Sequence, residues 1–330
     1  NPTDGVHPYY FWNNTAFPQH DGTRFIYPMT LGSDHNGEVF FSWPTHEGRD
    51  LTWLKDYPGP TSVFGYQVAF DFFGAYDVDR DYGIVQVADH NVLPGKKAWT
   101  WGQSDAGMAA QSSLTDEDGP YIEVQSGPLP TQADFEMLTP GKRVAWQEFW
   151  YPVGGLIDGF EYATRDMAVQ RREAGSPGSW NAAAGVGEDP SAGVELRFLA
   201  TGVFPGARIA IRRGDEQIVS RTVNFEPGYV HVIPLSISPG EAVTVDVTSA
   251  DGAALLRYES PLDVPERTAP TFETALIEPT GYQVYLDALD LDKKSDRVGA
   301  RRGYSAVLAG DLPPPPPLPH SARPRRPSVP

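Results

Sequence analysis

The stretch Trp99–Gln132, WTWGQSDAGMAAQSSLTDEDGPYIEVQSGPLPTQ, combines aromatic and acidic residues in a pattern that predicts two paired β-strands. Residues i and i+2 of a strand face the same way, so Trp99 and Trp101 predict one flat aromatic platform. The same spacing places three residues on one face of the next strand: Tyr121, Glu123 and Gln125. The C–H face of a sugar ring stacks on an indole ring, and carboxyl groups can hydrogen-bond the sugar hydroxyls or protonate the glycosidic oxygen. The stretch therefore predicts a sugar site. The alternative is core tryptophans beside a solvated acidic turn.

Residues 1–165 predict a large antiparallel sandwich or barrel. They hold seven of the eight tryptophans, and no helical period interrupts the strand-like runs. Clusters of Gly, Pro, Asp and Asn separate seven runs rich in aromatic and β-branched residues: 23–29, 38–43, 62–73, 83–88, 97–101, 121–127 and 142–151.

The remainder of the chain consists of segments that differ in composition and in hydrophobic pattern. Residues 166–193 have the composition of a linker, and residues 194–265 contain six short alternating runs typical of a small immunoglobulin-like sandwich. Residues 272–311 place Val284, Leu286, Leu289 and Leu291 at helical spacing, which predicts a short α-helical segment. Residues 312–330 are rich in proline and predict a disordered tail. The expected fold class is therefore mainly β with helices near the C-terminal end.

The charge is strongly acidic and uneven. The formal net charge is −17, and residues 1–160 carry 21 Asp and Glu against 8 Lys and Arg. Nucleic acids, anionic lipids and polyanionic polysaccharides need a positive field, so these partners are not expected. Neutral or cationic ligands remain.

The chain has no cysteine, which excludes disulfides, thiolate metal sites and a cysteine nucleophile. No apolar run approaches the roughly 20 residues that a membrane helix needs, and no signal peptide begins at residue 1. These features favour the cytoplasm. Because the sequence starts with Asn-Pro-Thr-Asp rather than Met, we expect an N-terminally truncated fragment whose targeting information is not in this sequence.

Acid–base chemistry on a glycoside needs two carboxyl groups near one another. Glu123 lies in mid-strand between Ile122 and Val124, where burial would raise its pKa and suit it to act as a general acid. The candidate second carboxylates are Asp50, Asp116 and Asp118, chosen from a wider set that also contains Glu38, Asp71 and Glu148.

Three histidines in polar loops, His35, His46 and His90, are candidates for contacts with sugar hydroxyls, as is Trp43. The segment from Asp77 to Gly83 imitates a calcium loop, but its glycine is one position late and position 12 is Ala88, so a hairpin turn is expected. No serine-hydrolase elbow, Walker loop or dinucleotide motif is present. We expect no cofactor and no metal.

Several long motifs resemble a bacterial family called DUF5107: YYFWNNTAFP (9–18), RFIYPM (24–29), DLTWLKDY (50–57), DFFGAYD (71–77), DHNVLPGKKAWTWG (89–102), LTDEDGPYIEVQSG (114–127) and EFWYPVGGL (148–156). The resemblance covers about residues 1–165. It implies a galactose-mutarotase-like supersandwich, here without its N-terminal half, followed by a small sandwich and the start of a tetratricopeptide-repeat region. This fold is shared by sugar epimerases, glycoside hydrolases and polysaccharide lyases, and fold alone does not fix function.

Three functions follow as hypotheses. The first is a glycoside hydrolase-like domain that acts on neutral glycans through Glu123 and a second carboxylate. The second is a carbohydrate-binding module without catalysis, attached to helical repeats that recruit a partner protein. The third is an aldose epimerase, which needs one acid and one base around a free monosaccharide.

Overall fold

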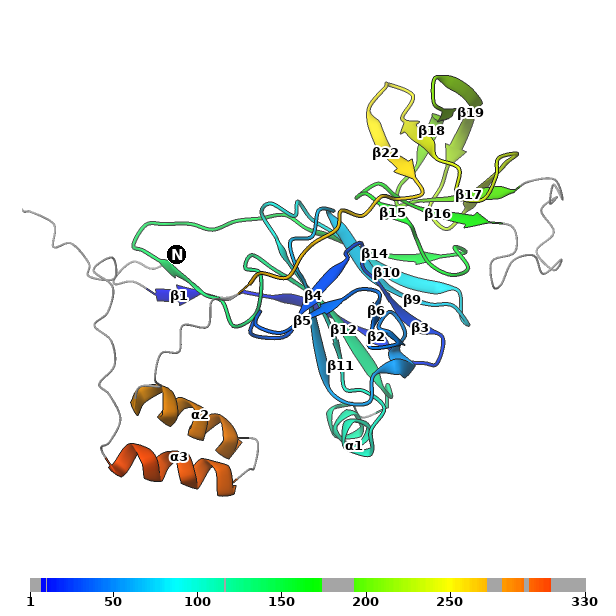
Figure 1. Cartoon of the computed structure of the whole chain (residues 1–330). Helices are drawn as coiled ribbons and strands as arrows, with labels where there is room; N and C mark the ends of the chain where they lie inside the picture. The colour runs from blue at the N-terminus through cyan, green and yellow to red at the C-terminus, as the bar shows by residue number, and fades with distance from the viewer. Residues whose placement is uncertain are drawn as a thin grey trace, which may run out of the picture. The chain divides into compact units, whose positions relative to one another are not determined.

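The computed structural model describes residues 7–9, 11–115, 117–173, 193–271, 281–293 and 297–309. The chain divides into two compact units, Asn1–Ala269 and Pro270–Pro330. The first unit is built almost entirely from antiparallel strands and the described part of the second from two helices, so the expected mainly-β fold class is confirmed (Figure 1).

Two sheets form the N-terminal sandwich. The larger sheet has six strands in the order β2 (Asn13–Pro18), β12 (Tyr121–Gly127), β11 (Gly95–Thr100), β8 (Thr61–Gly65), β4 (Leu31–Ser33) and β5 (Phe40–Ser42). The smaller sheet has the order β14 (Phe149–Gly154), β10 (Tyr82–Val87), β9 (Phe72–Asp77) and β3 (Thr23–Ile26). Side chains from both sheets, including Phe25, Phe73, Ala98, Ile122 and Val124, pack between them as one core.

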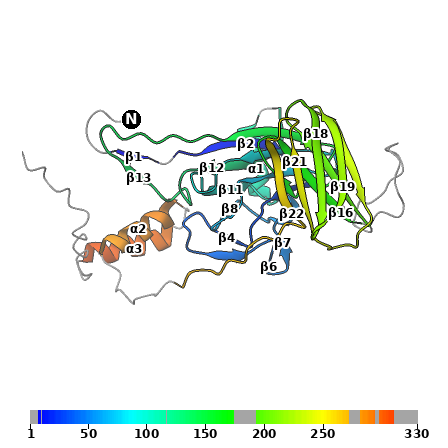
Figure 2. The same ribbon diagram turned by 90° about the horizontal axis from the view of Figure 1, so that it is seen from above.

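The second sandwich adds two more β-sheets to the first unit. One of its sheets has the order β15 (Tyr162–Ala163), β16 (Met167–Glu173), β17 (Val194–Ala200) and β20 (Val230–Leu235). The other has the order β19 (Glu216–Phe225), β18 (Phe204–Arg213), β21 (Val243–Thr248) and β22 (Ala254–Ser260), and Figure 2 shows these strands side by side in green and yellow. The six alternating runs predicted in residues 194–265 are all strands.

Strand β9 explains how the two sandwiches are joined. All six of its residues are buried because Phe73 and Ala75 enter the core of the first sandwich, whereas Phe72 and Tyr76 face the other way. Phe72 and Tyr76 pack in a second core with Ala168 and Leu199 of the small sandwich. A strand covered on both faces reads as a continuous apolar run, and DFFGAYD has that pattern.

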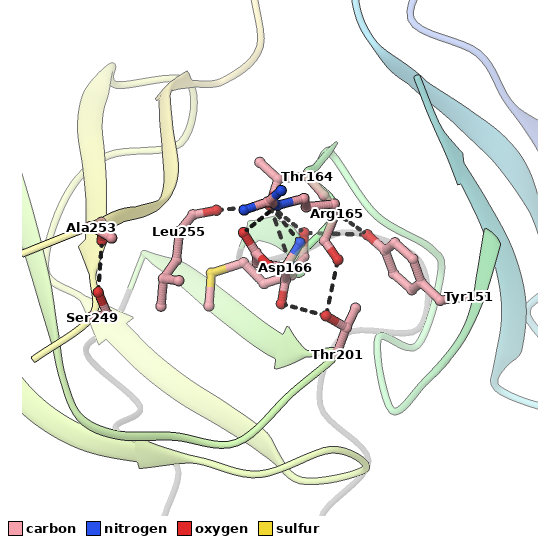
Figure 3. Close-up of polar contacts among 9 residues, drawn as sticks. Tyr151, Thr164, Arg165, Asp166, Thr201, Ser249, Ala253 and Leu255 are labelled. Carbon is pink, nitrogen blue, oxygen red and sulfur yellow. Dashed lines mark hydrogen bonds and ion pairs between the residues drawn. The ribbon is translucent and has the colours of Figure 1, made fainter. Parts of the chain in front are cut away.

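Polar contacts hold the same junction (Figure 3). The Tyr151 hydroxyl of β14 donates to the carbonyl oxygens of Thr164 (2.7 Å) and Met167 (3.3 Å), at the turn between β15 and β16. Thr201 Oγ1 donates to the Arg165 carbonyl oxygen (2.9 Å), and Thr164 Oγ1 donates to that of Leu255 (2.8 Å). The Tyr151 contacts therefore tie the small sandwich to the first one in addition to apolar packing, whereas the Thr201 and Thr164 contacts hold the turn between β15 and β16 within the small sandwich.

Some predicted boundaries were wrong. The run 62–73 is not one strand, because the chain turns between β8 and β9, where Gln67 has φ +47°. Residues 142–148 are not a strand, and β14 begins at Phe149. Residues 166–193 were expected as a linker, yet Met167–Glu173 forms β16, which pairs with β17 along its whole length. Residues 174–192 lie outside the described residues.

Several short elements lie outside the two sheets of the first sandwich. They are the two-stranded sheets β1 (His7–Tyr9) with β13 (Glu136–Leu138) and β6 (Thr45–His46) with β7 (Arg49–Asp50), the 3₁₀ helix η1 (Leu54–Asp56) and helix α1 (Asp105–Leu114). Helix α1 was not predicted. Its N-cap is Ser104, whose Oγ accepts a hydrogen bond from the Gly107 amide at 3.2 Å.

The second unit confirms the helical prediction for residues 272–311 where it is described. Helices α2 (Gly281–Lys293) and α3 (Arg297–Ala309) pack together, and a Cβ at Gly303 would lie 2.6 Å from Ala288 Cβ. The glycine thus permits the close approach of the two helices. The predicted tail, 312–330, lies outside the described residues. None of the helices in the described ranges is long and apolar enough to cross a membrane.

Candidate functional site

The outer face of the six-stranded sheet gathers polar and aromatic side chains from three neighbouring strands. On β12, Ile122 and Val124 point into the core, so Glu123 and Gln125 point outward. The antiparallel register sets Trp99 beside Glu123 and Lys97 beside Gln125. On the other side of β12, Asn14 of β2 lies opposite Gln125. We call this group the outer-face site.

Hydrogen bonds connect the polar members of the outer-face site into a chain. Glu123 Oε2 accepts from Gln125 Nε2 and from Asn14 Nδ2, the latter at 3.5 Å. Gln125 Oε1 accepts from Gln132 Nε2 at 2.7 Å and from Lys97 Nζ at 3.4 Å. Lys97 Nζ also donates to Gln132 Oε1 at 2.7 Å. The carboxylate and the amine are thus linked through two amides.

Lys97 is the most unusual group on this face. Only 5% of its surface is exposed, and its Nζ lies 5.4 Å from the centre of the Phe64 ring and 5.2 Å from that of Trp99. Burial lowers the pKa of Lys97 to about 8, and the negative charge of Glu123 opposes this decrease. An amine with a pKa near neutrality exchanges protons readily with a bound ligand.

The predicted flat platform of Trp99 and Trp101 is wrong. Their ring centres are 5.2 Å apart, but the ring planes stand at 83° to each other. Trp101 lies beyond the end of β11, next to Gly102, which has φ +73°. The alternation of side chains stops where the strand ends, so the two indoles meet edge to face.

A third tryptophan, which the sequence analysis did not select, packs beside this face. Trp12 makes an edge-to-face contact with Phe64 at 5.6 Å. A Cβ at Gly95 or at Gly127 would lie 2.5 Å from the Trp12 indole, so both glycines leave room for it. The absence of side chains at these two glycines therefore makes room for the Trp12 ring on the sheet surface.

The other predicted ligand-binding residues divide between this face and distant positions. Tyr121 is half-buried on β12, and His35 is exposed with its ring 5.8 Å from that of Phe64. Trp43 is instead buried in the core against Tyr27, and His46 packs on Phe41. The His90 ring is hydrogen-bonded to Asp71 through Nδ1 at 2.7 Å. The three histidines thus contact three different sets of neighbours.

The predicted carboxylate partners of Glu123 have other surroundings. Asp50 Oδ1 accepts from the Thr52 amide (2.9 Å) and hydroxyl (2.7 Å) next to β7. Asp118 is exposed in the turn before β12, and Asp116 lies outside the described residues. Glu123 itself is half-buried rather than buried, whereas Lys97 and Gln125 on the same face are each 5% exposed.

Glu148 has a structural role inside the first sandwich. Its carboxylate accepts hydrogen bonds from Ser126 Oγ (2.5 Å), Gln86 Nε2 (3.1 Å), Asn13 Nδ2 and the indoles of Trp146 (3.2 Å) and Trp150 (3.1 Å). Burial raises the pKa of Glu148, but these hydrogen bonds outweigh burial and hold the pKa below its ordinary value. A carboxylate with so many donors is an anchor and not an acid.

Within the described residues, one group could hold a metal ion by geometry. Asp71, Asp89 and His90 offer ligand atoms that lie within 4.8 Å of one another at the surface. Asp89 Oδ1 already accepts from the amide and side chain of Asn91, both at 2.9 Å. The segment from Asp77 to Gly83 is a hairpin turn between β9 and β10, as predicted.

Sequence reasoning selected Glu123, Gln125 and Trp99 but missed Lys97, Asn14 and Gln132. Lys97 precedes Trp99 by two residues, so alternation along the strand was a usable signal. Gln132 follows the end of β12 and reaches the site through the fold of the loop, which strand periodicity does not report.

Fold and side-chain arrangement together define an antiparallel β-sandwich protein with a polar and aromatic outer face. Residues 1–153 match the family model described as a domain of unknown function, DUF5107, which confirms the resemblance over the first sandwich. Residues 181–258 match a second family, described as the second domain of YphG-like proteins.

Two solved structures are similar to parts of the chain. A TPR-domain containing protein from Parabacteroides distasonis is 28% identical with a TM-score of 0.39, over 45% of this chain and 25% of that chain. The Slr1438 protein from Synechocystis sp. is 12% identical with a TM-score of 0.31, over 45% of each chain. The matched region therefore spans less than half the length of either protein.

Proposed function

We propose that the outer-face site binds a neutral carbohydrate. The observation that carries this proposal is the half-buried Trp99 beside a linked row of Glu123, Gln125 and Asn14. An exposed part of an indole offers a stacking surface for a sugar ring, and carboxylate and amide groups match its hydroxyls. The acidic first half of the chain, with 21 acidic residues against 8 basic, favours a ligand without negative charge.

Proton transfer at a free sugar is the second candidate function, and Lys97 favours it. Glycoside hydrolysis requires two carboxyl groups about 5–5.5 Å or about 6.5–9.5 Å apart. The described part of the outer-face site combines one carboxylate, Glu123, with one amine whose pKa is about 8. One base and one acid suffice to open and close a monosaccharide ring, so the aldose-epimerase class fits better than hydrolysis.

The test compares binding and turnover on the same protein. Calorimetry against a panel of neutral mono- and oligosaccharides should give a ligand that W99A binds at least tenfold more weakly, since covering a large apolar side chain contributes about 1.5–3 kcal/mol. W53A, which removes a half-buried tryptophan stacked by Arg24 and Lys55, is the matched control and should bind normally. Absence of binding to any sugar in the panel contradicts the proposal.

Catalysis is read by NMR of anomer interconversion and by release of reducing ends. If the site is catalytic, E123Q and K97M should each lower the rate at least a hundredfold while E123Q retains binding. The exposed strand residue Glu259 supplies the control E259Q. Sugar binding without turnover by the unmodified protein leaves a binding module.

The second unit supports a separate proposal of a protein partner. Helix α3 exposes Val298 and Leu308 together with Arg297, Arg301 and Arg302. Exposed apolar side chains among cations are typical of a surface that contacts another protein.

A further inference from the structure

An open pocket of about 480 Å³ lies in the first unit where β10 and β14 of the first sandwich meet β15 of the second. Three of its lining residues, Val87, Phe149 and Tyr162, belong to the core between the smaller sheet and the second sandwich. The pocket is therefore separate from the outer-face site, which lies on the six-stranded sheet. We call it the junction pocket.

Part of the lining of the junction pocket is aromatic. Trp146, Phe149 and Tyr162 are half-buried there, and the exposed side chain of Val92 adds an apolar contact. The face of an aromatic ring carries partial negative charge and attracts a cation. This part of the lining suits the apolar body of a small molecule and a positive charge close to it.

The lining also contains two accessible carboxylates, those of Asp71 and Asp89. The Asp71 side chain is 52% exposed. In both residues Oδ1 accepts the local hydrogen bonds, from His90 and Asn91 respectively, and Oδ2 accepts none among the described residues. One oxygen of Asp71 lies within 4.8 Å of one oxygen of Asp89, so a single ammonium group can contact both.

The charges around the pocket leave a negative excess. Arg165 lines the pocket, but its Nε lies 3.2 Å from Asp166 Oδ2. The buried amine of Lys96 donates to the Asp71 carbonyl oxygen at 3.2 Å and lies near Glu148. Four carboxylates therefore face two cations, namely Asp71, Asp89, Asp166 and Glu148 against Lys96 and Arg165. Protonation of His90 would reduce this excess from two to one and would not reverse it.

The carboxylates and the aromatic residues lie close to each other. Burial raises the pKa of Tyr162, and the negative charge of Asp71 raises it further, which places the Asp71 carboxylate within electrostatic reach of the Tyr162 hydroxyl. One small ligand can therefore contact both kinds of group.

The walls of the pocket are held in place before any ligand binds. The Tyr162 ring stacks on that of Tyr258, with ring centres 4.7 Å apart, and the Trp146 indole donates to Glu148 at 3.2 Å. The Tyr151 hydroxyl donates to the carbonyl oxygen of Thr164, which also lines the pocket (Figure 3). A preformed pocket loses little conformational entropy on binding.

We propose that the junction pocket binds a small primary ammonium ion with an apolar body. Asp71 and Asp89 accept hydrogen bonds from the ammonium group, and the apolar body lies against the aromatic residues. The acidic first half of the chain, with 21 acidic residues against 8 basic, attracts such a cation. The proposal is independent of the function proposed for the outer-face site, because it uses other residues on the other sheet.

The test is calorimetry of the whole chain at pH 7 with 2-phenylethylamine, which is protonated, and with its uncharged counterpart, 2-phenylethanol. We expect the amine to bind at least tenfold more tightly than the alcohol. D89N should weaken amine binding about tenfold or more, and its amide oxygen still accepts the Asn91 hydrogen bonds that shape the loop. D215N, at an exposed aspartate between β18 and β19, is the matched control and should leave binding unchanged.

V92K provides an independent readout at an exposed position on the rim. Its added ammonium group should compete for the two carboxylates and weaken amine binding about fivefold, whereas V92Q should bind the amine normally. The proposal is overturned if the amine does not bind, if the alcohol binds equally well, or if D89N and V92K both bind as the unmodified protein does. Binding of Ca²⁺ without binding of the amine would also overturn it and would assign the carboxylates to a metal ion.

Discussion

Glu123 and Glu148 are both glutamates near tryptophans, yet their surroundings differ sharply. Glu123 is half-buried on the outer face of a sheet, with amide donors and the amine of Lys97 nearby. Glu148 lies between two sheets, and five side-chain donors surround its carboxylate. At the residue scale, the neighbours brought by the fold decide how many donors a carboxylate accepts from and how far it is buried.

We predict that E148Q destabilises the protein by about 2 kcal/mol at pH 7, because the amide satisfies fewer of the donors and leaves buried Lys96 less compensated. The folded-state pKa of Glu148 is below its unfolded value, so its contribution is present above about pH 4.5 and is lost as the pH falls through the folded-state pKa. Urea unfolding at pH 7 and pH 3.5 should therefore show a smaller difference at the lower pH. E259Q should show no difference at either pH.

At the scale of elements, alternation of apolar and polar residues predicts the bounds of a strand well only while one face of the strand lies on the core and the other faces outward. β12 has the predicted bounds, 121–127, because Ile122 and Val124 alternate cleanly with outward polar residues. The predicted strand 97–101 ran one residue too far, because the alternation did not reveal that the chain turns at Gly102. Helix α1 carried a local signal, the N-cap at Ser104, that hydrophobic periodicity did not report.

The pairing of β11 with β12 leads to a prediction about glycine. G127A should destabilise the protein by about 1–3 kcal/mol and move Trp12 away from Phe64, since the new Cβ would lie 2.5 Å from the indole. Chemical denaturation and the tryptophan fluorescence maximum are the measurements. G59A is the matched control, because a Cβ at Gly59 meets no atom within 4 Å. Equal stability of both variants would show that Trp12 does not need this space.

In the first unit, the four larger sheets pack around three cores and leave several ionisable groups buried. Burial lowers the pKa of both Lys96 and Lys97 to about 8, and it raises the pKa of Tyr27, Tyr57, Tyr151 and Tyr258 above the ordinary value. These opposite shifts confine maximal stability to a window of pH.

We predict that the free energy of unfolding rises between pH 8 and pH 10 by about 1–3 kcal/mol. In this interval the unfolded chain keeps lysine protons that the folded protein has released. Above about pH 10 the unfolded chain loses tyrosine protons first, so stability should fall. Urea unfolding followed by far-ultraviolet circular dichroism at pH 7, 9 and 11 tests both limbs. K97M should reduce the rise, and K142M, at an exposed lysine, should not.

The sequence by itself determined the mainly-β class, the strands of the small sandwich, the helical segment and the outward row of Tyr121, Glu123 and Gln125. These features follow from periods of two and 3.6 residues, which are local properties of a chain. The tertiary structure alone decided that Glu148 is an anchor, that Lys97 is buried beside Glu123, and that Asp71 and Tyr162 line one pocket between two sandwiches. Each of these depends on residues far apart in sequence, and desolvation and hydrogen bonding act between whichever groups the packing brings together.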